Sequence, residues 1–199
     1  MTSDQTRQPA DCTRVYLARH GQTPLNESDV LRGLADPALD DIGCEQARRL
    51  GATLGPTNPS AVIASPLRRA QQTAQPVAER AGLQVATDQR LIDRDYGRWT
   101  GTSRESVIER FGSVDDALGV EPRSAVRDRA VAGLTDIARH NHGGTVVVVS
   151  HDAVNRQLLV AFDPALGDPD TVPQENGCFN FLELRDGRWT VLSVNELPG

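Results

Sequence analysis

A run of four consecutive valines, Val146–Val149, constrains the fold of this chain more than any other feature. A strand with one face in water alternates apolar and polar side chains, whereas a strand covered on both faces can be apolar throughout. The run therefore predicts an inner strand of a parallel sheet over 145–150, with helices packed on both faces. The run ends just before His151, and a second apolar segment, 14–18, ends just before Arg19 and His20 in the same way.

Other strand signals alternate along the chain with helical patterns. Strands are predicted over 61–64, weakly over 84–87, and over 178–184 and 189–194. Helices are predicted to begin after Asp40 or Asp41, at Ser65-Pro66 and near Asp152. Two further helices are predicted over 103–111 and 124–140. The Asp186-Gly187 pair predicts a tight hairpin between the last two strands. This alternation predicts the α/β class, as a three-layer α/β/α sandwich with a mostly parallel mixed sheet. Residues 1–12 are expected to be a flexible tail, and 13–199 a single domain.

Two of the helices carry more detailed expectations. The helix that begins at Ser65-Pro66 is expected to have Ser65 as its N-cap and to end or kink at Pro76, because proline lacks the backbone N–H that a helix interior uses. The helix that begins after Asp40 or Asp41 is expected to present one apolar face to the core, made of Ile42, Ala47, Leu50 and Leu54.

Composition narrows the functional classes. The net charge of −6 argues against a general nucleic-acid binder. No apolar run approaches the roughly 20 residues that span a bilayer, and the polar start of the chain lacks the apolar core of a secretory signal. Cys12, Cys44 and Cys178 are far apart, so neither a zinc site nor a disulfide framework is expected, and a cytoplasmic location is the simplest. All 21 basic residues are arginines, so any anion must be bound without lysine.

His20 and His151 each follow a predicted strand. Ligands of α/β sheets bind outside the carboxyl ends of the strands, so the two histidines share one crevice if their strands are neighbours. His20 can be a base, a metal ligand or a nucleophile. Arg19 carries a planar set of donors suited to phosphate, and Gly21 allows a ligand to approach closely. A single histidine after a strand is more often structural, so the other motifs decide its role.

Three further segments place polar side chains at the same edge, and each has a structural alternative. Arg68–Arg69 is predicted in the first turn of a helix, which favours an anion, but the pair could be solvated. Asp93 and Asp95 lie in a glycine-rich loop, where carboxylates usually form turns; one held against an apolar wall such as Trp99 would instead stay protonated. Asp152 could simply cap the following helix.

Four motifs in chain order resemble those of the histidine phosphatase superfamily, the phosphoglycerate-mutase-like family. "LARHGQTPLN" matches the family pattern L-x-R-H-G-x-T-x-x-N, and "GLADPALDDIGCEQA" matches G-x-x-D-x-x-L-x-x-x-G-x-x-Q-A. "SPLRRAQQTA" matches S-x-L-x-R-A-x-x-T-A, which selects Arg69 over Arg68. The final V-S-H matches the segment that ends at His151. Each motif is weak alone, but the four in order indicate the family.

The resemblance implies a phosphoglycerate-mutase-like fold and a metal-independent phosphatase in which His20 attacks phosphorus and is transiently phosphorylated. It assigns phosphate binding to Arg19, Asn26, Arg69 and His151. The neutral nitrogen of His20 must face the phosphate, so the other ring nitrogen needs a partner, expected to be a backbone carbonyl. Because the arginines supply positive charge, no cofactor and no metal are expected, and zinc ligation by the two histidines is rejected.

The proton donor is left open between two aspartates. Many family members carry glutamate in the pattern L-x-E-x-x-x-G, where this chain has the shorter Asp93. The acid-phosphatase branch instead uses an aspartate directly after the second histidine, and Asp152 occupies that position, where most mutase-like members have glycine. Asp93 is favoured, with Asp152 as the alternative, because the motif around Asp93 is otherwise of the mutase-like kind.

The expected substrate is a small phosphomonoester that releases phosphate; neither nucleic acid nor membrane is an expected partner, and the oligomeric state is left open. Phosphoglycerate mutase-type transfer is an alternative, but the short segment between Asp93 and His151 predicts an open pocket and therefore hydrolysis. A non-catalytic phospholigand-binding domain is disfavoured because His20 and Arg69 are both present. The acidic pair Asp115–Asp116 either disfavours highly anionic substrates or is solvated surface.

Overall fold

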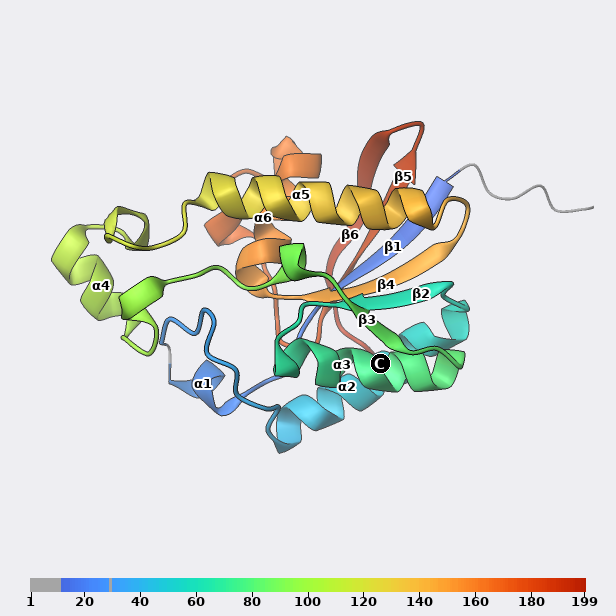
Figure 1. Cartoon of the computed structure of the whole chain (residues 1–199), viewed down its shortest axis with the longest axis horizontal. Helices are drawn as coiled ribbons and strands as arrows, with labels where there is room; N and C mark the ends of the chain where they lie inside the picture. Colours follow the sequence, from blue (N-terminus) through green and yellow to red (C-terminus); the bar gives the residue numbers. More distant parts are fainter. Residues whose placement is uncertain (1–11, 29) are drawn as a thin grey trace, which may run out of the picture.

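The chain folds around a six-stranded mixed sheet with strand order β3-β2-β4-β1-β5-β6 (Figure 1). The structure is a computed structural model that describes residues 12–28 and 30–199. The strands are β1 (Cys12–Arg19), β2 (Ala61–Ala64), β3 (Val85–Thr87), β4 (Thr145–Ser150), β5 (Phe179–Arg185) and β6 (Arg188–Glu196). The first four are parallel, and β5 and β6 are antiparallel. This confirms the predicted mostly parallel sheet, with a hairpin whose turn residues Asp186 and Gly187 both have positive φ.

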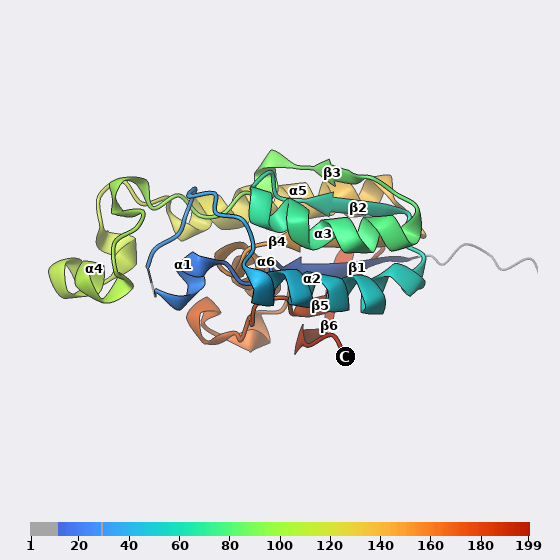
Figure 2. The same cartoon turned by 90° about the horizontal axis from the view of Figure 1, so that it is seen from below.

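Helices cover both faces of the sheet, as predicted. The α-helices are α1 (Pro24–Glu27), α2 (Asp41–Leu54), α3 (Arg68–Ala81), α4 (Arg104–Phe111), α5 (Arg123–His140) and α6 (Asp152–Phe162). Short 3-10 turns lie at Gly55–Thr57, Gln89–Leu91, Gly97–Trp99, Val114–Asp116, Pro164–Leu166 and Pro169–Thr171. Helices α2 and α3 lie on one face of the sheet and α5 and α6 on the other, whereas α4 lies beyond one end (Figures 1 and 2).

The valine run of β4 is divided between two hydrophobic clusters. Val146 and Val148 pack in the cluster that includes Leu134 of α5 and Leu158 of α6. Val147 and Val149 pack in the cluster that includes α2 and α3. All four valines are fully buried, which confirms that this strand is covered on both faces. The alternation of Cβ direction along a strand divides one apolar run between two cores.

The parallel pairing of β1 and β4 sets the position of the site. Arg19 lies opposite Ser150 in the register, so the chain leaves both strands at the same level. The backbone N–H of His20 donates to the carbonyl of Ser150 at 3.0 Å. His20 and His151 therefore emerge at neighbouring carboxyl ends, as their place in the sequence predicted.

Helix α2 corrects one expectation. Its N-cap is Asp40, whose carboxylate accepts a hydrogen bond from the Gly43 N–H at 2.7 Å. Ile42, however, is 53% exposed, so its predicted inward orientation is wrong. Ile42 precedes Ala47 by five positions, which places it about 140° around the helix from the buried face.

Helix α3 corrects two more expectations. It begins at Arg68 with Leu67 as N-cap. The Ser65 hydroxyl accepts a hydrogen bond from the Leu67 N–H at 3.3 Å, just before the helix, and also bonds to His151. It also continues through Pro76 to Ala81. The ring of Pro76 packs closely against α2 at Gly51, and the next two residues, Val77 and Ala78, are buried. This packing offsets the roughly 3 kcal/mol that an interior proline costs a helix.

Strand β1 includes Cys12, the last residue of the predicted tail. Cys12 is buried and belongs to β1, where it pairs with Arg185 of β5. The rest of the predicted tail, residues 1–11, lies outside the described residues.

Two glycines bring α2 against the loop that follows His20. A Cβ on Gly21 would lie 2.6 Å from the carbonyl oxygen of Gly43. A Cβ on Gly43 would lie 2.1 Å from the carbonyl oxygen of Gln22. Backbone atoms cannot yield as a flexible side chain can, so only glycine fits at these two contacts.

We predict that Gly43→Ala lowers the free energy of unfolding by about 1–3 kcal/mol, the usual cost of overpacking. Urea denaturation of this variant and of wild type measures the difference. Cys44→Ala, at the exposed next position of α2, is the matched control and should unfold like wild type. Equal midpoints for the two variants would show that the close approach is absent.

Candidate active site

The predicted site residues meet at a polar cavity of about 330 Å³ at the carboxyl ends of β1 and β4. Its lining includes Arg19, Asn26, Asp93 and Asp152, together with Arg32, Tyr96, Arg104 and Arg156. The other predicted residues, His20, Arg69 and His151, have no exposed surface and adjoin these lining residues. The structure thus gathers every predicted site residue in one place.

His20 is held in a defined orientation. Its Nδ1 lies 2.7 Å from the carbonyl oxygen of Gly21, to which it donates, as expected from the sequence. The Nε2 atom therefore keeps its lone pair, and it accepts a hydrogen bond from Nε of Arg69 at 3.2 Å. The ring of His151 is adjacent, with its centroid 5.2 Å from that of His20.

The guanidinium of Arg69 joins three segments of the chain. Besides His20, it donates to the carbonyl oxygens of Gly33 at 3.0 Å and Ala35 at 2.6 Å. Its Nη2 also forms an ion pair with Oδ2 of Asp93 at 2.8 Å. Every nitrogen of this fully buried cation is thereby paired.

Asp93 lies between Arg69 and His151. Its Oδ1 accepts a hydrogen bond from the Arg94 N–H at 2.8 Å, and its Oδ2 lies 3.7 Å from Nδ1 of His151. The other ring nitrogen of His151, Nε2, is 2.7 Å from the Ser65 hydroxyl. Trp99 does not form the expected apolar wall, because it packs against Phe111 in a separate cluster.

Arg19 and Asn26 face the same cavity. Arg19 donates through Nη1 to the carbonyl of Gln174, while its buried Nε has no hydrogen-bond partner among the described residues. The side-chain oxygen of Asn26 accepts hydrogen bonds from the N–H and hydroxyl of Thr23. The amide nitrogen of Asn26 is then the group with which it can donate.

Asp152 does not cap α6, which corrects the capping interpretation. The N-cap is His151, and Asp152 is the first residue of the helix. Both of its carboxylate oxygens lie 3.4 Å from Nη2 of Arg32, and one lies 3.9 Å from Nη2 of Arg19. Asp152 therefore accepts hydrogen bonds from Arg32 and forms a longer ion pair with Arg19.

The two aspartates have opposite electrostatic settings. Burial raises the pKa of Asp93, and the nearby Arg69 only partly offsets this. Burial also acts to raise the pKa of Asp152, but Arg19 and Arg32 outweigh it and hold that pKa below its usual value. Asp93 is thus the carboxyl that more readily carries a proton.

Both histidines are neutral at neutral pH. Burial is the main cause that lowers the pKa of His20 well below 6.5, and Arg69 and Arg19 lower it further. The pKa of His151 is lowered in the same way, by burial and then by Arg69. A neutral His20 has the lone pair that a nucleophile needs.

Several residues of the site had no assigned role in the sequence. Ser65 was interpreted as an N-cap, but its hydroxyl positions His151. Arg32 lies directly before a motif that matched the family, and its proximity to Asp152 depends on the fold alone. Arg104 and Arg156 come from α4 and α6, and no spacing in the sequence relates them.

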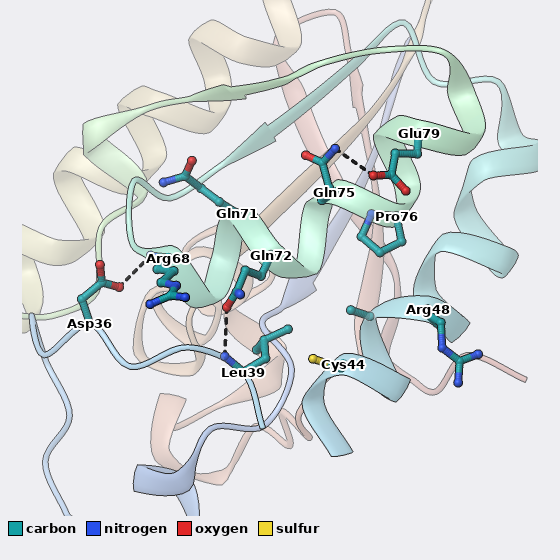
Figure 3. Close-up of a pocket in the computed structure, with 11 residues that line it drawn as sticks. Asp36, Leu39, Cys44, Arg48, Arg68, Gln71, Gln72, Gln75, Pro76 and Glu79 are labelled. Atoms are coloured by element: carbon teal, nitrogen blue, oxygen red, sulfur yellow. Dashed lines mark hydrogen bonds between the residues drawn. The ribbon is translucent and has the colours of Figure 1, made fainter. Parts of the chain in front are cut away.

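A second cavity, of about 570 Å³, lies between α2 and α3 (Figure 3). The Leu39 N–H donates to Gln72 beside it, and the Arg68 N–H donates to Asp36. It contains none of the histidines, and Arg68 rather than Arg69 lines it. We therefore place the chemistry at the smaller, polar cavity.

No helix in the described part of the chain is long and apolar enough to cross a membrane. Within 12–28 and 30–199, no group of three or more His, Cys, Asp or Glu side chains is arranged to hold a metal ion.

Comparison with known proteins agrees with the geometry. The family model of the histidine phosphatase superfamily (branch 1) matches residues 15–197. Phosphoserine phosphatase 1 of Hydrogenobacter thermophilus is 28% identical over 193 residues, which cover 92% of each chain. Phosphoglycerate mutase-like protein 4 of Arabidopsis thaliana is 31% identical, over 91% of this chain and 84% of that protein. The chain belongs to the histidine phosphatase superfamily, and it is a histidine phosphatase.

Solved structures show the same fold. A mycobacterial glucosyl-3-phosphoglycerate phosphatase has a TM-score of 0.84 at 26% identity, covering 93% of this chain and 99% of its own. The α/β fold predicted from the sequence is therefore the phosphoglycerate-mutase-like one.

We predict that Arg69→Gln destabilises the protein in a pH-dependent manner. Loss of one partner of a buried ion pair costs about 3–5 kcal/mol, because the other charge is left unpaired. A raised native pKa of Asp93 means that stability is lost as pH rises through that pKa, and removal of Arg69 raises it further. The loss should be largest near neutrality, where Asp93 is ionised, and should shrink as the pH falls and Asp93 takes up a proton in the folded protein.

Denaturant unfolding between pH 4 and 8 measures this dependence. Arg68→Gln, at the neighbouring exposed position, is the control and should show no such trend. A loss of stability for Arg69→Gln that is the same at every pH would contradict the pairing with Asp93.

Proposed function

We propose that this phosphatase hydrolyses a small phosphorylated metabolite in two steps, through a phosphohistidine on His20 and without a metal ion. The observation that carries the proposal is the geometry of His20, whose Nδ1 is bonded to Gly21 and whose Nε2 lone pair lies beside Arg69. Relatives named as phosphoserine and glucosyl-3-phosphoglycerate phosphatases support a small phosphomonoester as substrate.

The site has donors placed for the oxygens of a phosphoryl group. The buried Nε of Arg19 and Nδ1 of His151 have no hydrogen-bond partner among the described residues. Buried donors are normally satisfied, so a phosphate oxygen is the acceptor that fits them. Binding also requires a phosphate oxygen to take over the Nε donor of Arg69 from His20, which frees the nucleophile. Asn26 adds a neutral donor.

The first step transfers the phosphoryl group to His20. Nε2 attacks phosphorus, the bond from phosphorus to the ester oxygen breaks, and the leaving oxygen takes a proton from an acid. In the second step a water molecule gives a proton to the same group and attacks phosphorus, and the bond to Nε2 breaks. Arg19, Arg69 and His151 stabilise the charge on the transferring oxygens in both steps, which is the dominant contribution in phosphoryl transfer.

Asp93 is the proposed acid and base of these steps, and Asp152 is a positioning residue. Asp93 faces the site next to Arg69 and His151, and its raised pKa favours the protonated form that a general acid needs. Asp152 stays ionised and holds Arg19 and Arg32 at the cavity. Although its side chain is shorter than that of glutamate, Asp93 contacts Arg69 at 2.8 Å and lies 3.7 Å from His151.

We predict that a phosphomonoester labelled in its phosphoryl group transfers acid-labile label to wild type. His20→Ala should incorporate none and should release no phosphate, because no other described side chain occupies the position of Nε2. Rapid quenching followed by counting of the protein fraction measures the label. Conversion of 3-phosphoglycerate to its isomer, in place of phosphate release, would show a mutase. Phosphate release by His20→Ala at the wild-type rate would refute the intermediate.

We predict that Asp93→Asn slows hydrolysis of an alkyl phosphate by roughly 10²–10⁴-fold, the usual contribution of a general acid. The loss should be much smaller for p-nitrophenyl phosphate, whose leaving group departs without a proton. The wild-type kcat/KM should fall as pH rises through the raised pKa of Asp93, and this limb should disappear in Asp93→Asn.

Asp152→Asn is the matched comparison. It should keep the limb at high pH, because Asp152 does not supply the proton. If Asp152→Asn instead shows the larger loss with alkyl phosphates and removes that limb, the two assignments must be exchanged.

A further inference from the structure

The active-site cavity holds more positive charge than a single phosphate requires. Arg19 and Arg69 serve the phosphoryl group, and Arg69 is also paired with Asp93. Asp152 forms ion pairs with Arg32 and, at the longer distance of 3.9 Å, with Arg19. Two further arginines then line the same cavity, Arg104 and Arg156. In a chain with net charge −6, this local excess of arginine needs an explanation.

Arg104 and Arg156 form no ion pair with a carboxylate among the described side chains, in contrast to their neighbours. Asp170 is the nearby acid, and its ion pair is with Arg123 at 2.7 Å. Arg104 and Arg156 act on Asp170 only from beyond ion-pair distance, where they help to lower its pKa. Nη1 of Arg156 makes one long contact of 3.5 Å with the Asp170 carbonyl, and its buried Nε has no hydrogen-bond partner among the described residues.

Asp115, in the segment that follows α4, is also paired with arginines. The carboxylate of Asp115 pairs with Arg94 at 2.7 Å and with Arg123 at 2.6 Å. These ion pairs connect the segment after α4 to Arg94 and to Arg123 at the start of α5. Asp115 does not repel an anion from the cavity, since its charge is already matched by two arginines.

The position of Arg104 is unfavourable for its own helix. It is the first residue of α4, where the helix dipole disfavours a positive charge. Arg104 belongs to α4 and Arg156 to α6, and both also line the adjoining small cavity of about 30 Å³. Both are half-buried, so their charges are incompletely solvated. Such an arrangement suits an anion held between the two guanidinium groups.

We propose that the leaving group of the substrate carries a carboxylate, and that Arg104 and Arg156 bind it while Arg19 and Arg69 bind the phosphate. This proposal rests on the proposed function and names the substrate class of the same site. A carboxylate fits better than a second phosphate because the carboxylate of Asp152 also lines both cavities. A dianionic group would be repelled more strongly by Asp152 than a monoanionic one.

Two substrates that differ by one group test the proposal. 3-Phosphoglycerate has a carboxylate where glycerol 3-phosphate has a hydroxymethyl group, and both present a primary phosphate ester. We expect wild type to favour 3-phosphoglycerate in kcat/KM by at least about tenfold, the size of one charge-assisted contact. Arg104→Gln and Arg156→Gln should each reduce this preference about tenfold, through KM rather than kcat.

Arg110→Gln is the control, because Arg110 is an exposed residue of the same helix α4 and does not line the cavity. It should keep both the preference and the thermal midpoint of wild type. Equal kcat/KM of wild type for the two substrates, or equal losses for both substrates in the two variants, would overturn the proposal. Faster turnover of 2,3-bisphosphoglycerate than of 3-phosphoglycerate would overturn the choice of a carboxylate.

The two proposals fail in different ways. If wild type releases phosphate from neither substrate, or if His20→Ala still releases it from both, the proposed function is wrong. If wild type hydrolyses both substrates without preference and His20→Ala hydrolyses neither, the phosphatase stands and the carboxylate subsite is wrong.

Discussion

The active-site end of the molecule is built around one buried cation. Arg69 has no exposed surface, and a buried guanidinium is tolerated only when its donors are satisfied. Its partners are His20 after β1, the carbonyls of Gly33 and Ala35, and the carboxylate of Asp93. The hydrogen bonds of this one guanidinium therefore fix where the loops that carry Gly33, Ala35 and Asp93 lie relative to His20.

The same cavity gives two aspartates opposite properties. Asp93 is buried against a single cation, so its protonated form is favoured relative to an ordinary carboxyl. Asp152 faces Arg19 and Arg32, so its ionised form is favoured. Neighbouring carboxyls with pKa values displaced in opposite directions are a recurrent sign of divided roles. In the function we propose, Asp93 exchanges a proton with substrate, whereas Asp152 holds the arginines in place.

Much of the fold could be predicted from local patterns. The valine run indicated a doubly covered strand, and the Asp186-Gly187 pair indicated the hairpin, because each has a specific backbone or burial requirement. The details that failed were decided by neighbouring elements. The Ser65 hydroxyl bonds to His151 and α3 begins only at Arg68, and α3 continued through Pro76, which packs against α2. Such contacts join residues far apart in sequence, so periodicity cannot indicate them.

By itself the sequence determined the family and singled out Arg19, His20, Arg69 and His151 as candidate site residues, because these lie within short motifs whose order indicates the fold. It left Asp93 and Asp152 undecided, and it gave no sign that Arg32, Arg104 and Arg156 share the cavity. The tertiary structure decided both points. A pKa depends on burial and on charges nearby in space, and the charge of a pocket is the sum over loops and helices that only folding brings together.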